Sequence, residues 1–230
     1  MKKIIIKDEI FEKFPDFKRG VLICEGVKND FESEKIRRLL EEEIKKKNGF
    51  TSHPHIEQWD DAHRKFNSNP NKYPPSVKSL IKRVSKGKSI PFINNLVALF
   101  NYISLKYIIP CGGDDIDKIE GNLVLGFATG EEKFIPLGGN EEEAPEKGEV
   151  IYFDDKTGKV MCRKWNWRNG DFSKMEKSTK RAVINIDAIG SIEREVVVKA
   201  GEEMKKLLEE ECGAKVSFLI LDKDRRVEKI

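Results

Sequence analysis

The chain has 230 residues, of which 43 are basic and 40 are acidic, and its net charge is +3. Its length allows one sizeable hydrophobic core, and a hydrophobic fraction of 38% excludes a disordered chain. Proteins held on nucleic acid mainly by phosphate contacts are usually far more basic. We therefore expect no DNA partner, and any contact with RNA must come from a local basic patch or a shaped pocket.

The sequence indicates no metal site, cofactor or membrane segment. Its cysteines are scattered without a C-x-x-C pair, at Cys24, Cys111, Cys162 and Cys212. No histidines stand at ligand spacing beside them, so we expect neither a bound metal nor a disulfide framework, and no cofactor. The N-terminal apolar run, residues 4–6, is too short for a signal peptide or a membrane span. We therefore expect a cytoplasmic protein without a membrane partner.

The first third of the chain indicates two short strands and two helices. Strands are predicted at residues 4–6 and 21–25. A helix is predicted from residue 29 or 30 to 47, because its apolar residues recur at near-helical spacing. A second helix is expected to begin near Glu57 and to bury Trp59.

Two further helices follow, at residues 76–86 and 94–107. The outer face of the first is basic and carries Lys78, Lys82, Arg83 and Lys86, with Lys88 just beyond. Clustered cations beside a cleft would suit phosphate groups. The candidate RNA-binding residues are therefore Lys82, Arg83, Lys86 and Lys88. The alternative is an ordinary solvated helix face.

Strands dominate from Pro110 onward. They are predicted at residues 123–128, 134–137, 150–153, 160–163, 182–188 and 216–221, with a last helix at residues 192–211. Central strands with helices grouped around them predict an α+β fold with a sheet or sandwich core. Because the chain has no internal repeat and no long linker, we expect residues 1–230 to form a single domain, with an N-terminal lobe of about residues 1–75.

One stretch carries a family resemblance. Residues 94–105 (NNLVALFNYISL) lead into residues 110–119 (PCGGDDIDKI). This passage resembles the editing domain of the phenylalanyl-tRNA synthetase β subunit, in which an N-P-[VI]-V-D-x-x-N-Y-[VI] helix precedes a Pro-Leu-His-Ala-Phe-Asp turn and an Asp-Lys-Ile segment. The likeness extends from about residue 59 to 188. It is similar in particular to free-standing members, called B3/4 domain proteins, whose Trp-Asn-Trp-Arg motif stands here at residues 165–168.

The resemblance implies an α+β core of the B3/4 type with a β-sandwich or mixed sheet flanked by helices, and it implies a function in tRNA editing. Synthetase members hydrolyse the ester of wrongly charged tRNA, and free-standing relatives act as aminoacyl-tRNA deacylases in trans. The expected partner is therefore aminoacyl-tRNA, and a synthetase is a second candidate. The histidine of the family's turn falls on Gly112, and the Met-Gly-Gly loop is replaced by the Trp-Asn-Trp-Arg segment. Tyrosine as the edited amino acid therefore does not follow.

Hydrolysis of an activated ester needs a positioned water and a site for the developing oxyanion, but no nucleophilic side chain. The candidate catalytic residues are Asn101, Gly112, Gly113 and Asp114. The candidate substrate-binding residues are Asn94, Asn95, Ser104, Asp115, Trp165, Asn166, Trp167 and Arg168. In this hypothesis the glycine N–H groups approach the ester, an aspartate orients water or holds the amino group, Arg168 binds phosphate or carboxylate, and a tryptophan stacks on the terminal adenine.

Each assignment has a structural alternative. The Asn101 and Ser104 side chains would then only cap buried backbone, a tryptophan would belong to the core, and Asp115 would form a turn. Cys111 stands where a nucleophile would be useful, but no histidine near it in sequence could activate it. Double glycines such as Gly112-Gly113 more often mark tight turns than phosphate sites.

Two rival functions remain. A non-catalytic tRNA- or synthetase-binding module would have its pocket filled by side chains. A binder of a small, amino-acid-like molecule would have a closed pocket without a basic approach. The cations that decide this last point are Lys78, Lys82, Arg83, Lys86, Lys88, Arg163 and Lys164.

Overall fold

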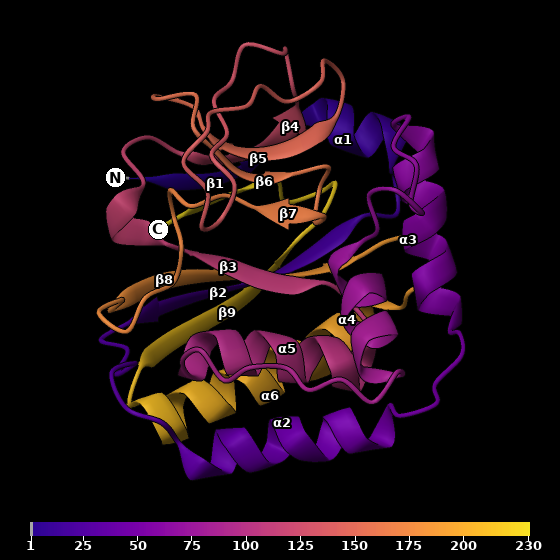
Figure 1. Cartoon of the computed structure of the whole chain (residues 1–230). Coiled ribbons are helices and arrows are strands. Elements are labelled where there is room, and N and C mark those ends of the chain that lie inside the picture. Colours follow the sequence, from indigo (N-terminus) through magenta and orange to yellow (C-terminus); the bar gives the residue numbers. More distant parts are fainter. Residues whose placement is uncertain (1) are drawn as a thin grey trace.

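Two β-sheets packed face to face form the centre of the protein. The computed structural model describes residues 2–230 (Figure 1). The six-stranded sheet has the order β10-β1-β4-β5-β6-β7, and all its neighbours are antiparallel except β1 and β4. Its strands are β1 (Lys3–Ile6), β4 (Leu123–Phe127), β5 (Val150–Asp154), β6 (Val160–Arg163), β7 (Arg168–Asn169) and β10 (Val227–Lys229).

The second sheet is four-stranded, wholly antiparallel, and has the order β3-β8-β2-β9. Its strands are β2 (Lys18–Glu25), β3 (Cys111–Asp115), β8 (Arg181–Ala188) and β9 (Lys215–Leu221). Eight successive residues of β2 pair with β8, and β3 is left with one free edge. This edge becomes important for the site.

Helices cover the outer face of the four-stranded sheet. In Figure 1, α5 and α6 lie directly beneath it and α2 lies below them, while α1 and α3 flank the sheets at one side. The helices are α1 (Asp8–Lys13), α2 (Glu34–Lys46), α3 (Pro54–Lys65), α4 (Ser76–Val84), α5 (Asn95–Tyr107) and α6 (Arg194–Cys212), with a short 3₁₀ turn, η1 (Ile116–Lys118). This arrangement confirms the α+β fold with a mixed-sheet core flanked by helices.

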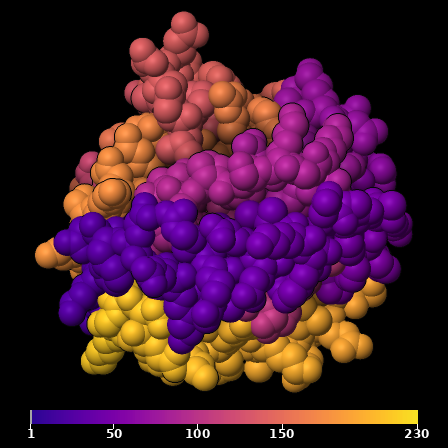
Figure 2. Space-filling model, turned by 60° about the horizontal axis from the view of Figure 1, so that its bottom comes forward, coloured from indigo at the N-terminus to yellow at the C-terminus, as the bar shows by residue number. Residues whose placement is uncertain are grey.

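The surface seen from the helical side is formed largely by the first third of the chain. Figure 2 shows this indigo-to-purple band crossing the face, with the pink loop between β4 and β5 projecting beyond it. Strands β1 and β2, from the N-terminal lobe, belong to the two sheets. We therefore interpret residues 2–230 as one domain. No helix among these residues is long and apolar enough to cross a membrane.

Trp165 is fully buried at the centre of an aromatic cluster. Its indole meets the rings of Phe14, Phe17 and Trp59 edge-on, with ring centroids 4.8, 5.0 and 5.3 Å away. Offset and edge-to-face pairs of this kind are the arrangements that aromatic quadrupoles favour. The cluster joins the loop after β6 to α3 and to the segment between α1 and β2.

Helix starts differ from the sequence-based expectation where a cap decides them. α2 begins at Glu34 rather than near residue 30, because the Ser33 hydroxyl accepts a hydrogen bond from the Ile36 N–H. α3 begins at Pro54, before Glu57, because proline is well suited to the first turn of a helix and the His53 ring accepts a bond from the His55 N–H.

Two predictions for the β region were wrong. Gly112 and Gly113 lie in strand β3, not in a turn. Residues 134–137 form only isolated bridges, Phe134 with Glu143 and Pro136 with Gly170, because Pro136 has no N–H to donate to a ladder. The sequence analysis also missed α1, β7 and β10, which are too short to show a period.

Replacing Trp59 with alanine should destabilise the protein by about 3–5 kcal/mol, because its fully buried indole leaves a cavity beside Trp165. Chemical denaturation followed by circular dichroism measures the change. Trp167→Ala is the control. Trp167 is half-buried, so its replacement should lower the free energy of unfolding by well under half as much. Equal losses for the two variants would contradict the assignment of Trp59 to the core.

Candidate functional site

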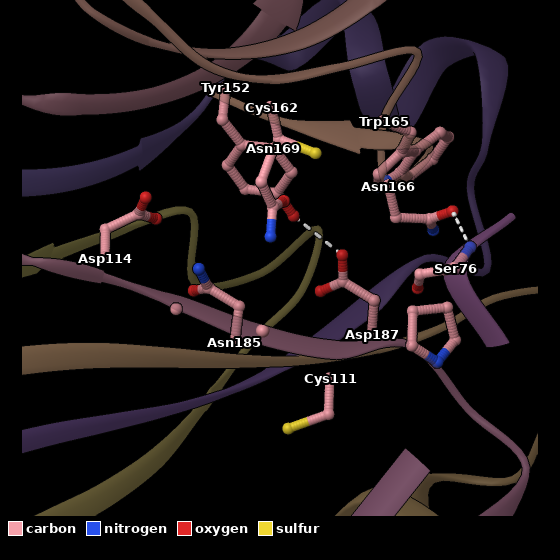
Figure 3. Close-up of a pocket in the computed structure, with 13 residues that line it drawn as sticks. Ser76, Cys111, Asp114, Tyr152, Cys162, Trp165, Asn166, Asn169, Asn185 and Asp187 are labelled. Atoms are coloured by element: carbon pink, nitrogen blue, oxygen red, sulfur yellow. Dashed lines mark hydrogen bonds between the residues drawn. The ribbon is translucent and has the colours of Figure 1, made fainter. Parts of the chain in front are cut away.

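The site lies between the two sheets, beside the free edge of β3. It consists of two adjoining spaces, an inner cavity of about 80 Å³ and an outer hollow of about 640 Å³. The residues that line only the inner cavity are Pro110, Tyr152, Cys162, Trp165, Asn166, Asn185 and Asp187. The two spaces share Ser76, Cys111, Gly112, Gly113, Asp114 and Asn169, so these residues mark the junction. Side chains from both sheets point toward one another there (Figure 3).

A buried ion pair lies beside the inner cavity, and its carboxylate, Asp187, is part of the cavity lining. The Arg19 Nε and Nη2 atoms donate to the two carboxylate oxygens of Asp187 at 2.8 and 3.0 Å. The Tyr152 hydroxyl donates to Asp187 Oδ2 at 2.7 Å, and the Arg19 guanidinium lies 4.3 Å from the centre of the Tyr152 ring. Burial by itself raises the pKa of Asp187, and the Arg19 charge opposes that effect. Arg19 and Asp187 face each other on neighbouring strands, whereas Tyr152 comes from the opposite sheet.

Asp114 places a second carboxylate at the junction. Its side chain is 9% exposed, and its Oδ1 accepts a 2.5 Å hydrogen bond from the Ser173 hydroxyl. Burial raises the pKa of Asp114 to about 6, although Ser173 and Arg19 both oppose the shift. At neutral pH most of the population is therefore ionised, and the carboxylate remains basic enough to accept a proton.

The free edge of β3 presents one N–H group to the outer hollow. In an antiparallel ladder, successive residues direct their N–H groups alternately toward the partner strand and away from it. The Cys111 N–H points away and donates to Ser104 Oγ, and the Asp115 N–H points away and donates to the Ser173 carbonyl. Gly113 lies midway between these two residues in the strand. Its N–H therefore faces the free edge, between two N–H groups that already have acceptors.

The two glycines differ in what surrounds them. A Cβ atom on Gly113 would lie 2.5 Å from the Val183 carbonyl oxygen, so only glycine fits there. A Cβ atom on Gly112 would meet nothing within 4 Å. Gly112 pairs with Asn185, whose side chain enters the inner cavity. The missing side chain at Gly112 thus leaves open space at the junction.

The outer hollow is mostly apolar. Asn101 lines it on α5, and Asn94 lines it while capping that helix, because its Oδ1 accepts from the Val97 N–H at 3.0 Å. Ile93 and Leu137 lie on its rim with 54% and 53% of their surface exposed. Two large exposed aliphatic side chains beside one hollow form a surface suited to a flat, apolar face of a ligand.

Comparisons with known proteins agree with this fold. A family model described as the B3/4 domain matches residues 58–213. The chain belongs to the B3/4 domain family. The structure of an N-terminal fragment of the phenylalanyl-tRNA synthetase β subunit from Pyrococcus horikoshii has a similar fold, with a TM-score of 0.53 and 14% identity. The match covers 94% of this chain and 53% of that fragment, so the chain spans about half the fragment's length. A search of curated proteins gave no match.

Five predicted substrate-binding residues of this B3/4 chain lie outside both spaces, and Asn95, Ser104 and Asp115 are three of them. The Asn95 side chain accepts from the Ser33 N–H and donates to the Phe31 carbonyl, at 3.0 Å each. Ser104 accepts from Cys111, and the carboxylate of Asp115 accepts from the Asp117 N–H and the Thr179 hydroxyl. These side chains hold neighbouring backbone in place. A structural role therefore describes these three side chains better than substrate binding, because each is buried and already hydrogen-bonded within the protein.

The side chains of the family's Trp-Asn-Trp-Arg motif lie in two different places, because the backbone turns at the start of the motif. Lys164 and Trp165 have positive φ angles of 45° and 65°, a costly conformation that turns Trp165 into the core. Trp165 and Asn166 line the inner cavity. Trp167 packs against Tyr73 instead, with ring centroids 4.7 Å apart, and Arg168 is exposed, 3.8 Å from Glu143. Neither of these last two lines either space. Trp165 cannot stack on an adenine, because the core rings cover it.

Some basic residues of the B3/4 domain are paired and others are exposed. Arg163 and Lys164 are buried and bonded to Glu149, and Lys78 pairs with Asp60 at 2.6 Å. The candidate RNA-binding residues remain at the surface of α4 and the turn after it; they are Lys82, Arg83, Lys86 and Lys88. The outer hollow has two further lysines on its rim, Lys174, which pairs with Asp171, and the exposed Lys177.

Within residues 2–230, no group of three or more His, Cys, Asp or Glu side chains is placed to hold a metal ion. All four cysteines are free thiols. Cys111 does not suit nucleophilic catalysis, because burial raises the pKa of its thiol and its side chain points away from Asp187 in Figure 3. The chemistry of the site therefore rests on carboxylates, amides and backbone.

Sequence analysis missed several residues of the site, namely Arg19, Tyr152, Ser173, Asn185 and Asp187. One signal was available. Asn185 and Asp187 stand two residues apart in an otherwise apolar strand, so both belong on the same face of the sheet. Polar side chains on one face of a buried strand need partners or a ligand.

The raised pKa of Asp114 predicts a pH-dependent effect of Asp114→Asn on stability. A buried acid whose folded-state pKa exceeds its unfolded value of 3.8 costs stability as pH rises from about 4 to about 6. The asparagine variant lacks that cost, so its free energy of unfolding relative to the wild type should increase by up to about 3 kcal/mol over that interval. Urea denaturation at pH 4 and pH 7.5 measures the change. A difference that is the same at both pH values would contradict the raised pKa.

Proposed function

We propose that this B3/4 protein is a stand-alone trans-editing factor that hydrolyses the ester bond of misacylated aminoacyl-tRNA. One observation carries the proposal. A buried carboxylate with a raised pKa, Asp114, lies next to the free N–H of Gly113, where the polar inner cavity meets the apolar outer hollow. A base and a hydrogen-bond donor for an oxyanion lie where a polar space meets an apolar one. This arrangement suits a substrate that joins two chemically different halves, such as an amino acid and an adenosine.

In the proposed reaction, Asp114 accepts a proton from a water molecule as its oxygen attacks the ester carbonyl carbon. The carbonyl oxygen becomes negative and accepts a hydrogen bond from the Gly113 N–H. When the tetrahedral intermediate collapses, the bond between this carbon and the ribose oxygen breaks, and the proton passes from Asp114 to that oxygen. The products are a free amino acid and uncharged tRNA. A base whose pKa lies slightly below the working pH serves such a step well.

The outer hollow would receive the terminal adenosine. Ile93 and Leu137 would contact the faces of the base, and Asn101 would hydrogen-bond the ribose. Lys177 on the rim, and the lysines of α4 farther away, would contact phosphates. The expected partner is therefore aminoacyl-tRNA, and a synthetase that supplies it is a second candidate.

Asp114→Asn should lower kcat/KM for the best aminoacyl-tRNA by about 10²–10⁴-fold, because the amide cannot accept the proton from water. The measurement is ester loss over time with a panel of tRNAs carrying correct and incorrect amino acids. The wild-type rate should increase with pH through about 6 and then level off. Asp117→Asn, at an exposed carboxylate paired with Arg181, is the matched control. If no aminoacyl-tRNA in the panel loses its ester faster than in buffer, the proposal is wrong.

A second candidate, binding of a small amino-acid-like molecule without RNA, is favoured by the pairing of Arg163, Lys164 and Lys78, which removes three cations from the approach. A binding module without turnover is less well supported, because the inner cavity is open rather than filled by side chains.

Replacing Lys82 and Lys86 together with alanine should weaken binding of uncharged tRNA and reduce the slope of log affinity against log salt by about 1.4–1.8, since each lost phosphate contact removes about 0.7–0.9. Fluorescence titrations at several salt concentrations measure this. Lys206→Ala with Lys215→Ala, on α6 and β9, is the control pair. An unchanged slope would favour the small-molecule candidate.

A further inference from the structure

The inner cavity is too small for an aromatic side chain. Its volume is about 80 Å³. An engineered protein cavity of about 150 Å³ is large enough to hold benzene. A phenyl or phenol ring would therefore need Tyr152, Trp165 or the Arg19–Asp187 pair to move, and all of these are buried and bonded or tightly packed.

The cavity also contains a buried polar side chain, Asn185, with an atom that lacks a protein partner. Asn185 is 8% exposed, its side chain enters the cavity from β8, and its Oδ1 has no hydrogen-bond partner among residues 2–230 (Figure 3). The Asn185 carboxamide offers an acceptor through this atom and donors through its Nδ2 atom. Hydrogen bonds of such buried polar groups are costly to leave unmade, which points to a ligand able both to donate and to accept them.

Anionic ligand groups fit less well. The Arg19 charge is taken up by Asp187, so the remaining carboxylate, Asp114, leaves the site with a net negative charge. An anionic side chain would be repelled. A small aliphatic side chain would fit by volume, but it would leave the Asn185 carboxamide oxygen without a partner.

We propose that the inner cavity selects amino acids with a small, uncharged polar side chain that carries a hydroxyl or carboxamide group, as in serine, threonine or asparagine. This inference rests on the proposed function for its reaction, but the selectivity is a property of the cavity. A site built to hydrogen-bond a substrate group discriminates strongly against analogues that lack the group. Aromatic amino acids are disfavoured by the cavity volume, and aliphatic ones by the unpaired oxygen of Asn185.

The test separates selectivity from catalysis. Adenosines carrying an amino acid through a stable amide in place of the ester report binding without turnover, and calorimetry measures their Kd. The seryl, threonyl or asparaginyl compound should bind at least about tenfold more tightly than the alanyl, valyl, phenylalanyl and tyrosyl compounds. Asn185→Ala should remove most of that preference. Asn166→Ala is a second variant, used if the first fails to fold by circular dichroism. Asn48→Ala, at an exposed position after α2, should leave the preference unchanged.

Hydrolysis of the corresponding aminoacyl-tRNAs is measured in parallel. Tight binding of the polar compounds without hydrolysis of any aminoacyl-tRNA would support the selectivity and overturn the deacylase proposal. Hydrolysis of phenylalanyl-, tyrosyl- or valyl-tRNA at least as fast as the polar set would overturn the selectivity and leave the deacylase standing. Equal Kd values across the compounds, or a preference that Asn185→Ala and Asn166→Ala leave intact, would also overturn it.

Discussion

The buried ion pair between Arg19 and Asp187 connects the fold to the site. Arg19 is fully buried, and removing its charge from water is costly unless the geometry of the pair is good. Two parallel hydrogen bonds between neighbouring strands provide that geometry, and the Tyr152 hydroxyl adds a bond from the opposite sheet. A hydrogen bond therefore joins the two sheets at this point, and the Tyr152 and Asp187 side chains line the inner cavity.

The free edge of β3 gives the site its proposed chemistry. A strand at the end of a sheet exposes alternate backbone groups, which proteins usually protect. Here Ser104 and the Ser173 carbonyl engage the N–H groups on either side, and the N–H of Gly113 faces the outer hollow. The carboxylate of Asp114 follows immediately in the chain, so one short strand positions both a hydrogen-bond donor and a base.

Long periodic elements could be predicted from the sequence, and residues whose role depends on distant segments could not. The helix over residues 94–107 and the strand over 182–188 were correctly expected, because their apolar patterns extend over many residues. Within that helix, Asn101 faces the outer hollow, whereas Asn95 and Ser104 serve the backbone around them. All three are polar residues in an apolar stripe. Which of them meets a ligand depends on what packs against each turn.

The sequence by itself determined the α+β class, the family and the stretch that lines the junction, because hydrophobic period and local motif are properties of neighbouring residues. The tertiary structure alone decided that Gly112 and Gly113 form a strand rather than a turn, and that the tryptophans of one motif separate into a core residue and a half-buried one. It also brought together Arg19, Asp187 and Tyr152, which stand far apart in the chain. Strand pairing and burial bring distant segments together. Whether a buried charge has a partner therefore depends on the tertiary structure, and an unpaired buried charge is costly.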